Sequence, residues 1–205
     1  PGFIDSHSHH FGDLNKNRVG LSTSSQGITT IVIGQDGNGY PMDSLTKWMQ
    51  TKPVVSNVAT YTGQSSLREI AMGENDLYRN ATNAEIDQMK SILASELEKG
   101  SLGLSTGLEY EASFYSSKQE VLDLAKVTAA HQGLYTSHIR SEDLHMDEAI
   151  RLPGGPPAAG GPDHRAGVAD GSAGGSSVDS ASAAGSVMRG RFLGSSHRHQ
   201  GSSRS

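Results

Sequence analysis

The sequence predicts an α/β fold: a partial (β/α)8 TIM barrel, made of the first five strands, followed by a disordered C-terminal tail. Short apolar runs alternate with amphipathic helical patterns up to about residue 151, which is typical of a parallel sheet covered by helices. Several runs are continuously apolar or small, as in strands covered on both faces. A complete eight-unit barrel needs about 250 residues, and the alternation ends after five strands. A small doubly wound sheet remains an alternative from the pattern alone.

The five predicted strands are short runs bounded by polar or turn residues. They comprise residues 3–7, 29–34 (TTIVIG), 54–60 (VVSNVAT), 102–107 (LGLSTG) and 134–138 (LYTSH). Their lengths of five to seven residues are those of ordinary strands.

A helix is predicted between the third and fourth strands. Thr82 and Glu85 have the spacing of an N-terminal capping box, and Gly100 is placed to end the helix. Apolar residues recur between them at helical spacing, namely Ile86, Met89, Leu93 and Leu97.

Two further helices are predicted on the same grounds. Ser117 and Glu120 repeat the capping-box spacing, and an apolar stripe then continues toward a stop at Gly133. After the fifth strand, MDEAIRL begins a helix that the Pro-Gly-Gly-Pro stretch at residues 153–156 interrupts.

The composition changes abruptly near residue 152. From residue 153 onward roughly two thirds of the residues are Gly, Ser, Ala or Pro, and Lys, Glu, Ile and Tyr are missing. So few large apolar groups cannot offset the entropy of ordering the backbone, which predicts disorder. We therefore expect a barrel part at residues 1–151 and a low-complexity tail at 152–205. A shifted reading frame in GC-rich coding sequence would give such a change.

Composition and charge exclude several classes of function. The chain of 205 residues has a net charge of −5 and no cysteine, which argues against nucleic-acid partners, disulfides and thiolate metal sites. No apolar run approaches the roughly 20 residues that cross a bilayer. No signal-like segment is seen, which favours the cytoplasm, although the start at Pro1 suggests missing upstream sequence. The expected partner is a small molecule, and the sequence does not predict an oligomeric state.

Polar side chains at the ends of three predicted strands are the candidate site residues. They are His7 and His9, Asp36, and His138, and polar residues at these ends mark the active face of a parallel barrel. Imidazole and carboxylate groups are ligands of zinc and similar divalent ions. His7 and His9 are two residues apart, so in an extended segment they would face the same way.

Each candidate also has a simpler interpretation. Asp36, flanked by Gln35 and Gly37, has the sequence context of a turn residue. His138 could be a hydrogen-bonded core histidine, and His131 near a helix end is most simply a favourable cation or a solvated side chain. These alternatives remain open from spacing alone.

Five motifs, in order and with familiar spacing, add a resemblance over about residues 1–151. The chain closely resembles the N-acyl-D-amino-acid deacylase (D-aminoacylase) family of the amidohydrolase superfamily. The motifs are PGFIDSHSHH, GITTIVIGQDG, NVATYTGQSSLR, GLSTGLEY and GLYTSHIRSE.

The resemblance implies a zinc-dependent hydrolase of the amide bond of N-acyl-D-amino acids, in which water activated by one or two divalent ions attacks the carbonyl. It implies that His7 and His9 bind one ion and that His138 binds the other. Asp36 occupies the position of a metal-bridging cysteine in well-known members, and a carboxylate can also bridge two ions. Gln64 and the segment 111–113 depart from the family pattern.

The family also implies two residues that the predicted barrel part does not supply. They are a second histidine from the sixth strand and a proton-shuttling aspartate from the eighth, so no catalytic residue is assigned. A cyclic-amide hydrolase of the dihydropyrimidinase type is less favoured, because the fourth predicted strand lacks the lysine that this type carboxylates. A non-catalytic remnant of a barrel is the alternative from another class.

Overall fold

The computed structural model describes residues 1–17, 19–51 and 53–151. The elements, in chain order, are β1 (Phe3–Asp5), α1 (Phe11–Asn17), α2 (Leu21–Ser24), β2 (Ile28–Ile33), α3 (Met42–Thr51), β3 (Asn57–Thr60), β4 (Thr62–Gly63), α4 (Gln64–Met72), α5 (Asn83–Glu98), β5 (Gly103–Gly107), α6 (Glu111–Phe114), α7 (Lys118–Ala130), β6 (Leu134–His138) and α8 (Met146–Arg151). No helix within these described ranges is both long and apolar enough to span a membrane. The predicted tail, residues 152–205, lies outside the described residues.

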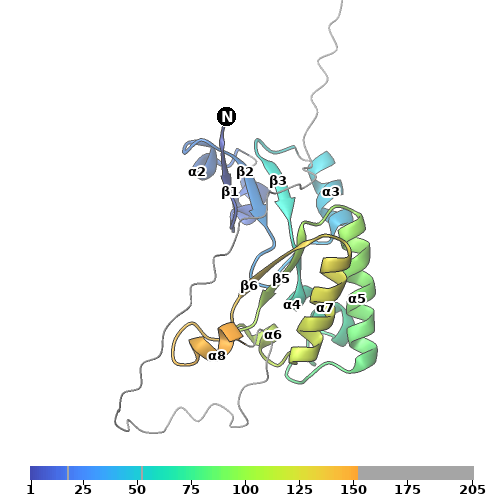
Figure 1. The fold of residues 1–205 in the computed structure, drawn as a ribbon. Coiled ribbons are helices and arrows are strands. Elements are labelled where there is room, and N and C mark those ends of the chain that lie inside the picture. Colours follow the sequence, from blue (N-terminus) through green and yellow to red (C-terminus); the bar gives the residue numbers. More distant parts are fainter. Residues whose placement is uncertain (18, 52, 152–205) are drawn as a thin grey trace, which may run out of the picture.

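The strands form two parallel three-stranded sheets, which is the predicted α/β class (Figure 1). One sheet has the order β1-β2-β3 and the other β4-β5-β6. All pairs are parallel, so the carboxyl ends of the strands within each sheet lie at the same edge. The strand order follows the chain order in both sheets.

The two sheets are linked by a single extended segment. β3 and β4 are separated only by Tyr61, whose backbone N–H donates to Ile33 O at 3.0 Å. On the other side, Leu102 N–H donates to Thr60 O at 2.8 Å, just before β5 begins. β2 and β5 therefore flank the same segment of chain, and the ordering of strands continues from one sheet into the other.

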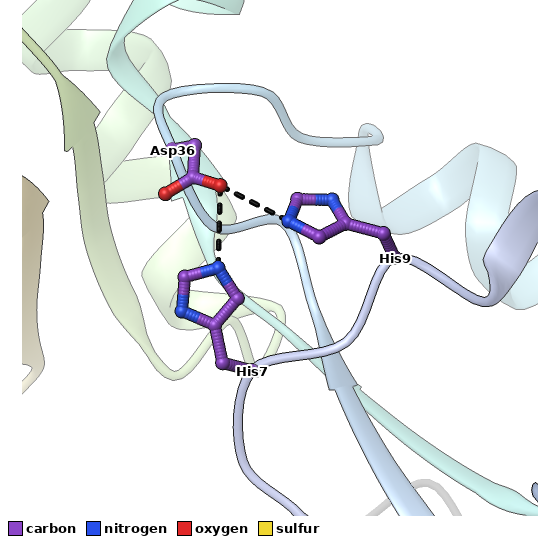
Figure 2. Close-up of side chains that lie close together, drawn as sticks. All are labelled: His7, His9 and Asp36. Carbon is purple, nitrogen blue, oxygen red and sulfur yellow. Dashed lines mark hydrogen bonds and ion pairs between the residues drawn. The ribbon is translucent and has the colours of Figure 1, made fainter.

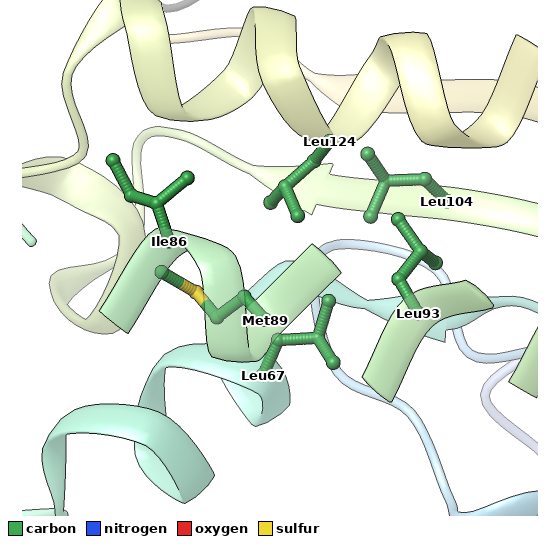
Figure 3. Close-up of a cluster of buried hydrophobic side chains, with 6 residues drawn as sticks. All are labelled: Leu67, Ile86, Met89, Leu93, Leu104 and Leu124. Carbon is green, nitrogen blue, oxygen red and sulfur yellow. The ribbon is translucent and has the colours of Figure 1, made fainter. Parts of the chain in front are cut away.

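Helices pack against one face of each sheet. Around β5, one cluster of buried residues draws on α4, α5, β5 and α7 (Figure 3). Its members are Leu67, Ile86, Met89, Leu93, Leu104 and Leu124. α5 and α7 run side by side next to this sheet (Figure 1). A second cluster joins the other sheet to α1 and α3 through Leu14, Ile31, Ile33, Leu45 and Val58.

A smaller cluster lies on the opposite side of the strands. Val32, Ala59 and Tyr61 are buried together, with Leu102 and Leu134 packed against them. Ile31 and Ile33 point to the helices whereas Val32 does not, as expected for alternating side chains in a strand. Both faces of β2 are thus covered, which agrees with its continuously apolar sequence.

Some strand boundaries differ from the prediction. The first strand ends at Asp5 rather than His7, and β3 begins at Asn57 rather than Val54. Within the described ranges β1 pairs only with β2 and is mostly exposed. The expectation that this strand is buried is therefore wrong.

The sequence analysis also missed α1 to α4 and α6. α1, α2 and α6 are too short for a clear periodicity, whereas α3 places Met42, Leu45 and Met49 at helical spacing and could have been predicted.

The capping residues predicted the starts of two helices more accurately than the apolar runs predicted the strand boundaries. Thr82 and Glu85 form the predicted capping box of α5, and α7 begins after its predicted cap Ser117. Ser117 Oγ accepts from Glu120 N–H at 3.1 Å, but the Glu120 carboxylate binds buried Gln64 and Arg68. The second predicted capping box is therefore only half formed, because a tertiary ion pair takes the carboxylate.

The α5 cap predicts an acid-sensitive contribution to stability. The Arg79 guanidinium, followed by the Thr82 backbone N–H, lowers the pKa of the Glu85 carboxyl from 4.5 to about 2. A lowered pKa stabilises the fold above the ordinary pKa, and this contribution is lost as the pH falls from about 4.5 toward 2. Glu85→Gln is expected to be less stable than the wild type at neutral pH and to approach it on acidification.

Denaturant unfolding at several pH values would check this expectation. Glu98→Gln, in the last turn of the same helix, controls for the loss of one negative charge. Equal pH dependence of the wild type and Glu85→Gln between pH 5 and 2 would contradict it.

Candidate metal centre

Three of the four predicted ligands converge in the structure. His7 Nε2 lies 3.2 Å and His9 Nε2 lies 3.0 Å from the same oxygen of Asp36, Oδ2 (Figure 2). The candidate ligand atoms of these three residues all lie within 4.8 Å of one another. The histidines come from the segment after β1 and the aspartate from the turn after β2, so the cluster sits at the carboxyl edge of the sheet.

The fourth predicted ligand faces the other oxygen of the same carboxylate. His138, the last residue of β6, has its Nδ1 3.9 Å from Asp36 Oδ1. Asp36 thus lies between the His7–His9 pair and His138. One of its carboxylate oxygens faces His7 and His9, and the other faces His138. A carboxylate in this position can be shared by two cations.

The two histidines do not converge for the predicted reason. His7 and His9 lie beyond the end of β1, in irregular backbone, so simple alternation along a strand does not align them. The Asp5 carboxylate accepts the His7 backbone N–H at 3.3 Å, while the Ser8 backbone N–H donates to Val32 O at 2.9 Å. These contacts hold the segment that carries His7 and His9 against the end of β2, close to the turn that carries Asp36.

The Asp36 turn is tightly constrained. Asp36 has φ 57°, in the left-handed region that few non-glycine residues adopt. Gly107 packs so closely against this turn that a Cβ added to Gly107 would lie 2.1 Å from Asp36 O. The buried hydroxyl of Ser105 donates to Gly34 O at 2.5 Å and accepts Gly37 N–H at 3.2 Å. The second sheet thereby fixes the position of a carboxylate that the first sheet carries.

The surroundings of His138 are acidic. Its Nε2 lies 2.8 Å from Glu109 Oε2 and 3.8 Å from Glu142 Oε1, and the Tyr110 hydroxyl lies 3.1 Å from Nδ1. Partial desolvation, followed by the charges of three nearby carboxylates including Asp36, raises the pKa of the Tyr110 hydroxyl. The phenol therefore remains protonated at neutral pH, and the negative potential favours a cation.

These residues fit a divalent metal ion. Imidazole nitrogens and carboxylate oxygens are zinc ligands, and two ligand atoms on one tetrahedral zinc at about 2.1 Å would lie about 3.4 Å apart. The distances from Asp36 Oδ2 to the two Nε2 atoms are 3.2 and 3.0 Å. Hydrogen bonds from the two imidazoles to one carboxylate oxygen have similar lengths, so geometry alone allows both states. The His7 and His9 side chains are 53% and 70% exposed, which leaves the site open to solvent.

Sequence reasoning missed Glu109, Tyr110 and Glu142. A signal existed for Glu109, because it follows the end of a predicted strand by two residues, as Asp36 does. The histidine it contacts is 29 residues away in the sequence. His131 is the C-cap residue of α7 and is exposed, which agrees with its interpretation as a solvated side chain near a helix end.

The chain has clear relatives among curated proteins. It is 29% identical to the D-aminoacylase of Alcaligenes xylosoxydans xylosoxydans over 174 residues, which cover 73% of this chain and 36% of that protein. It is 32% identical to the N-acyl-D-aspartate deacylase of the same organism over 181 residues, covering 74% and 36%. The chain thus spans about a third of the length of these relatives. No protein-family model matches it.

Solved structures of D-aminoacylase and of a related deacylase also match this chain. A crystal structure of D-aminoacylase, described as defining a subset of amidohydrolases, matches with a TM-score of 0.68 and 30% identity, covering 74% of this chain and 37% of that one. N-acyl-D-glutamate deacylase from Bordetella bronchiseptica, complexed with zinc and a phosphonate inhibitor, matches with a TM-score of 0.70 and 30% identity, covering 75% and 37%.

The fold is therefore that of an amidohydrolase, an α/β protein with parallel strands. Within that class, the homologues of this chain are D-aminoacylase and the N-acyl-D-aspartate and N-acyl-D-glutamate deacylases. The family resemblance that the five sequence motifs indicated is confirmed.

The contact beneath the Asp36 turn gives a testable prediction. Gly107→Ala is expected to push the turn away from β5 and to weaken binding of a divalent cation by at least about 10-fold, the scale on which supporting residues affect metal sites. Gly12→Ala is the matched control, because an added Cβ there meets nothing within 4 Å. Calorimetric zinc titration of both variants, with thermal unfolding in parallel, would check it. Equal affinities would contradict the proposed constraint.

Proposed function

We propose that this chain carries part of the active site of a zinc-dependent amidohydrolase that cleaves the amide bond of N-acyl-D-amino acids. The observation that carries the proposal is the convergence of two imidazoles on one oxygen of Asp36, with a third imidazole facing the other oxygen. The names of the relatives supply the reaction class and the substrate class. The metal in the matched structures supports a metal-dependent reaction.

We further propose that residues 1–151 are the N-terminal part of a (β/α)8 barrel. The sequential order of parallel strands supports this, as does the continuity between the two sheets through Tyr61. The helices pack on one side of the strands and a small apolar cluster fills the other. The candidate ligands lie at the carboxyl ends of strands, where barrel enzymes place their sites.

In this proposal each ligand has a defined task. His7, His9 and Asp36 would hold one divalent ion, and His138, which faces the other oxygen of Asp36, would contribute to holding a second. A bound divalent ion would supply an activated water and polarise the substrate carbonyl. Asp36 itself contributes a carboxylate whose position is fixed by Ser105 and Gly107. No residue within 1–151 is assigned to the proton-transfer step.

A non-catalytic remnant is the alternative that a specific observation favours. The outer strand β1 exposes Phe3 (72%) and Ile4 (52%), and an open sheet edge with exposed apolar side chains promotes association. The cyclic-amide hydrolase alternative finds less support, because β5 contains no lysine.

The metal site leads to a direct prediction. The full chain is expected to bind zinc, and Asp36→Ala is expected to lose more affinity than the about 10–100-fold typical of an outer-shell residue, because it removes an oxygen shared by the imidazoles. His145→Ala, which alters an exposed histidine that is not part of the His7–His9–Asp36 cluster, should bind like the wild type. Zinc titration by calorimetry would measure all three. Unchanged affinity in Asp36→Ala would refute the assignment.

The reaction class is tested separately. With zinc bound, a catalytic chain, in contrast to a remnant, would release free amino acid from N-acetyl-D-glutamate, N-acetyl-D-aspartate or a neutral N-acetyl-D-amino acid, and not from the L-enantiomers. Asp36→Ala should lack this activity at the same zinc concentration. Zinc binding without any turnover would contradict the catalytic proposal and support the remnant. Size-exclusion chromatography would show whether the sheet edge drives association.

A further inference from the structure

We propose that Glu109 is a positioning residue that fixes the tautomer of His138, so that Nδ1 is the nitrogen presented to the metal. This inference rests on the proposed metal site, because it assigns His138 a direction toward Asp36. It gives a role to a residue of the GLSTGLEY motif to which the sequence analysis assigned none.

The two nitrogens of His138 face different groups. Nε2 lies 2.8 Å from Glu109 Oε2, whereas Nδ1 lies 3.9 Å from Asp36 Oδ1. The Tyr110 hydroxyl also approaches Nδ1, at 3.1 Å, with the two rings 4.7 Å apart between centroids. One edge of the imidazole therefore points at Glu109, and the other points at the shared carboxylate.

The hydrogen-bonding capacities of these groups select one tautomer. An ionised carboxylate only accepts hydrogen bonds, so the short contact with Glu109 requires a hydrogen on Nε2. In the neutral ring Nδ1 then carries the lone pair, which accepts the Tyr110 hydroxyl hydrogen, and a metal at Nδ1 would take the place of that hydrogen bond. A nitrogen with a free lone pair is also what a metal ligand requires, and carboxylates that hold the far N–H of a ligating histidine are common partners in metal sites.

The geometry favours Glu109 as this outer partner and not as a metal ligand. Within the described residues, the group whose ligand atoms lie within 4.8 Å of one another contains His7, His9 and Asp36. Neither His138 nor Glu109 belongs to it, so their roles are assigned from the contacts of the two ring nitrogens of His138. Glu109 contacts the nitrogen on the side of the ring away from Asp36. A metal bound at Nε2 would lie on the Glu109 side of the ring, away from Asp36.

Strand pairing places Glu109 beside His138. Gly107 and His138 are partners in the parallel pairing of β5 with β6, and Leu108 N–H donates to His138 O at 2.9 Å. The side chain of the next residue, Glu109, is thereby held near the ring. Glu142 comes from the chain beyond β6 and reaches only 3.8 Å from Nε2, which is too long for a hydrogen bond.

The tautomer can be measured directly in the metal-free full chain. Two-bond ¹H–¹⁵N correlations of the histidine ring, recorded at about pH 8, above the ordinary imidazole pKa of about 6.5, distinguish Nε2–H from Nδ1–H. His138 would be identified by comparison with His138→Ala. We expect Nε2–H in the wild type and in Glu109→Gln, whose amide oxygen still accepts, and a mixture of tautomers in Glu109→Ala.

Zinc titration provides the second readout. Glu109→Ala should bind zinc about 10–100-fold more weakly than the wild type, the loss typical of removing such a partner, and Glu109→Gln should recover part of that loss. Glu142→Ala is the matched control, because it removes a carboxylate near the same nitrogen without removing a hydrogen bond. Its tautomer should match that of the wild type.

Three results would overturn the inference. They are an Nδ1–H tautomer in the wild type, an unchanged tautomer in Glu109→Ala, and an equal effect of Glu142→Ala on the tautomer. Failure of the wild type to bind zinc would instead overturn the proposed metal site, and with it the metal-facing role of Nδ1. The tautomer comparison in metal-free protein would still decide whether Glu109 fixes the ring.

Discussion

The close packing of the turn after β2 against β5 is the contact on which the site depends. Asp36 is carried by one sheet but held by the other, through Ser105 hydrogen bonds and the backbone of Gly107. Without this contact the carboxylate would be a loop side chain with a choice of positions. With it, a single oxygen lies within 3.2 Å of two imidazole nitrogens. The left-handed backbone of Asp36 is tolerated because the surrounding structure leaves little room for another conformation.

A buried polar network supports the neighbouring segment in a related way. Arg68 is fully buried and donates to the Glu120 carboxylate and to the backbone carbonyl of Ala112. Gln64 donates to the other Glu120 oxygen at 2.7 Å. Because an unpaired buried charge is costly, these contacts favour one arrangement of the chain between β5 and α7. Glu109 and Tyr110, which contact His138, lie at the start of that chain.

Much of the fold was predictable because it depends on local signals. Apolar runs predicted all but the short strand β4, and the Thr82 capping box predicted the start of α5. The Glu120 carboxylate could not be predicted, since its partners Gln64 and Arg68 lie more than fifty residues away. The residues of the candidate site divide in the same way, into those that local sequence predicts and those that depend on contacts between distant segments. His7, His9 and Asp36 stand out after apolar runs, whereas the role of Glu109 depends on the pairing of β5 with β6.

The residue type at position 36 also affects how resistant the candidate site is to oxidation. The family resemblance implies a cysteine there, and this chain has an aspartate and no cysteine at all. A thiolate is oxidised stepwise to sulfenic, sulfinic and sulfonic acids, and the later steps are irreversible. A carboxylate undergoes none of these reactions. The proposed metal site around Asp36 would therefore lack a soft, tightly binding sulfur ligand, and peroxides could not inactivate it through a thiol at this position.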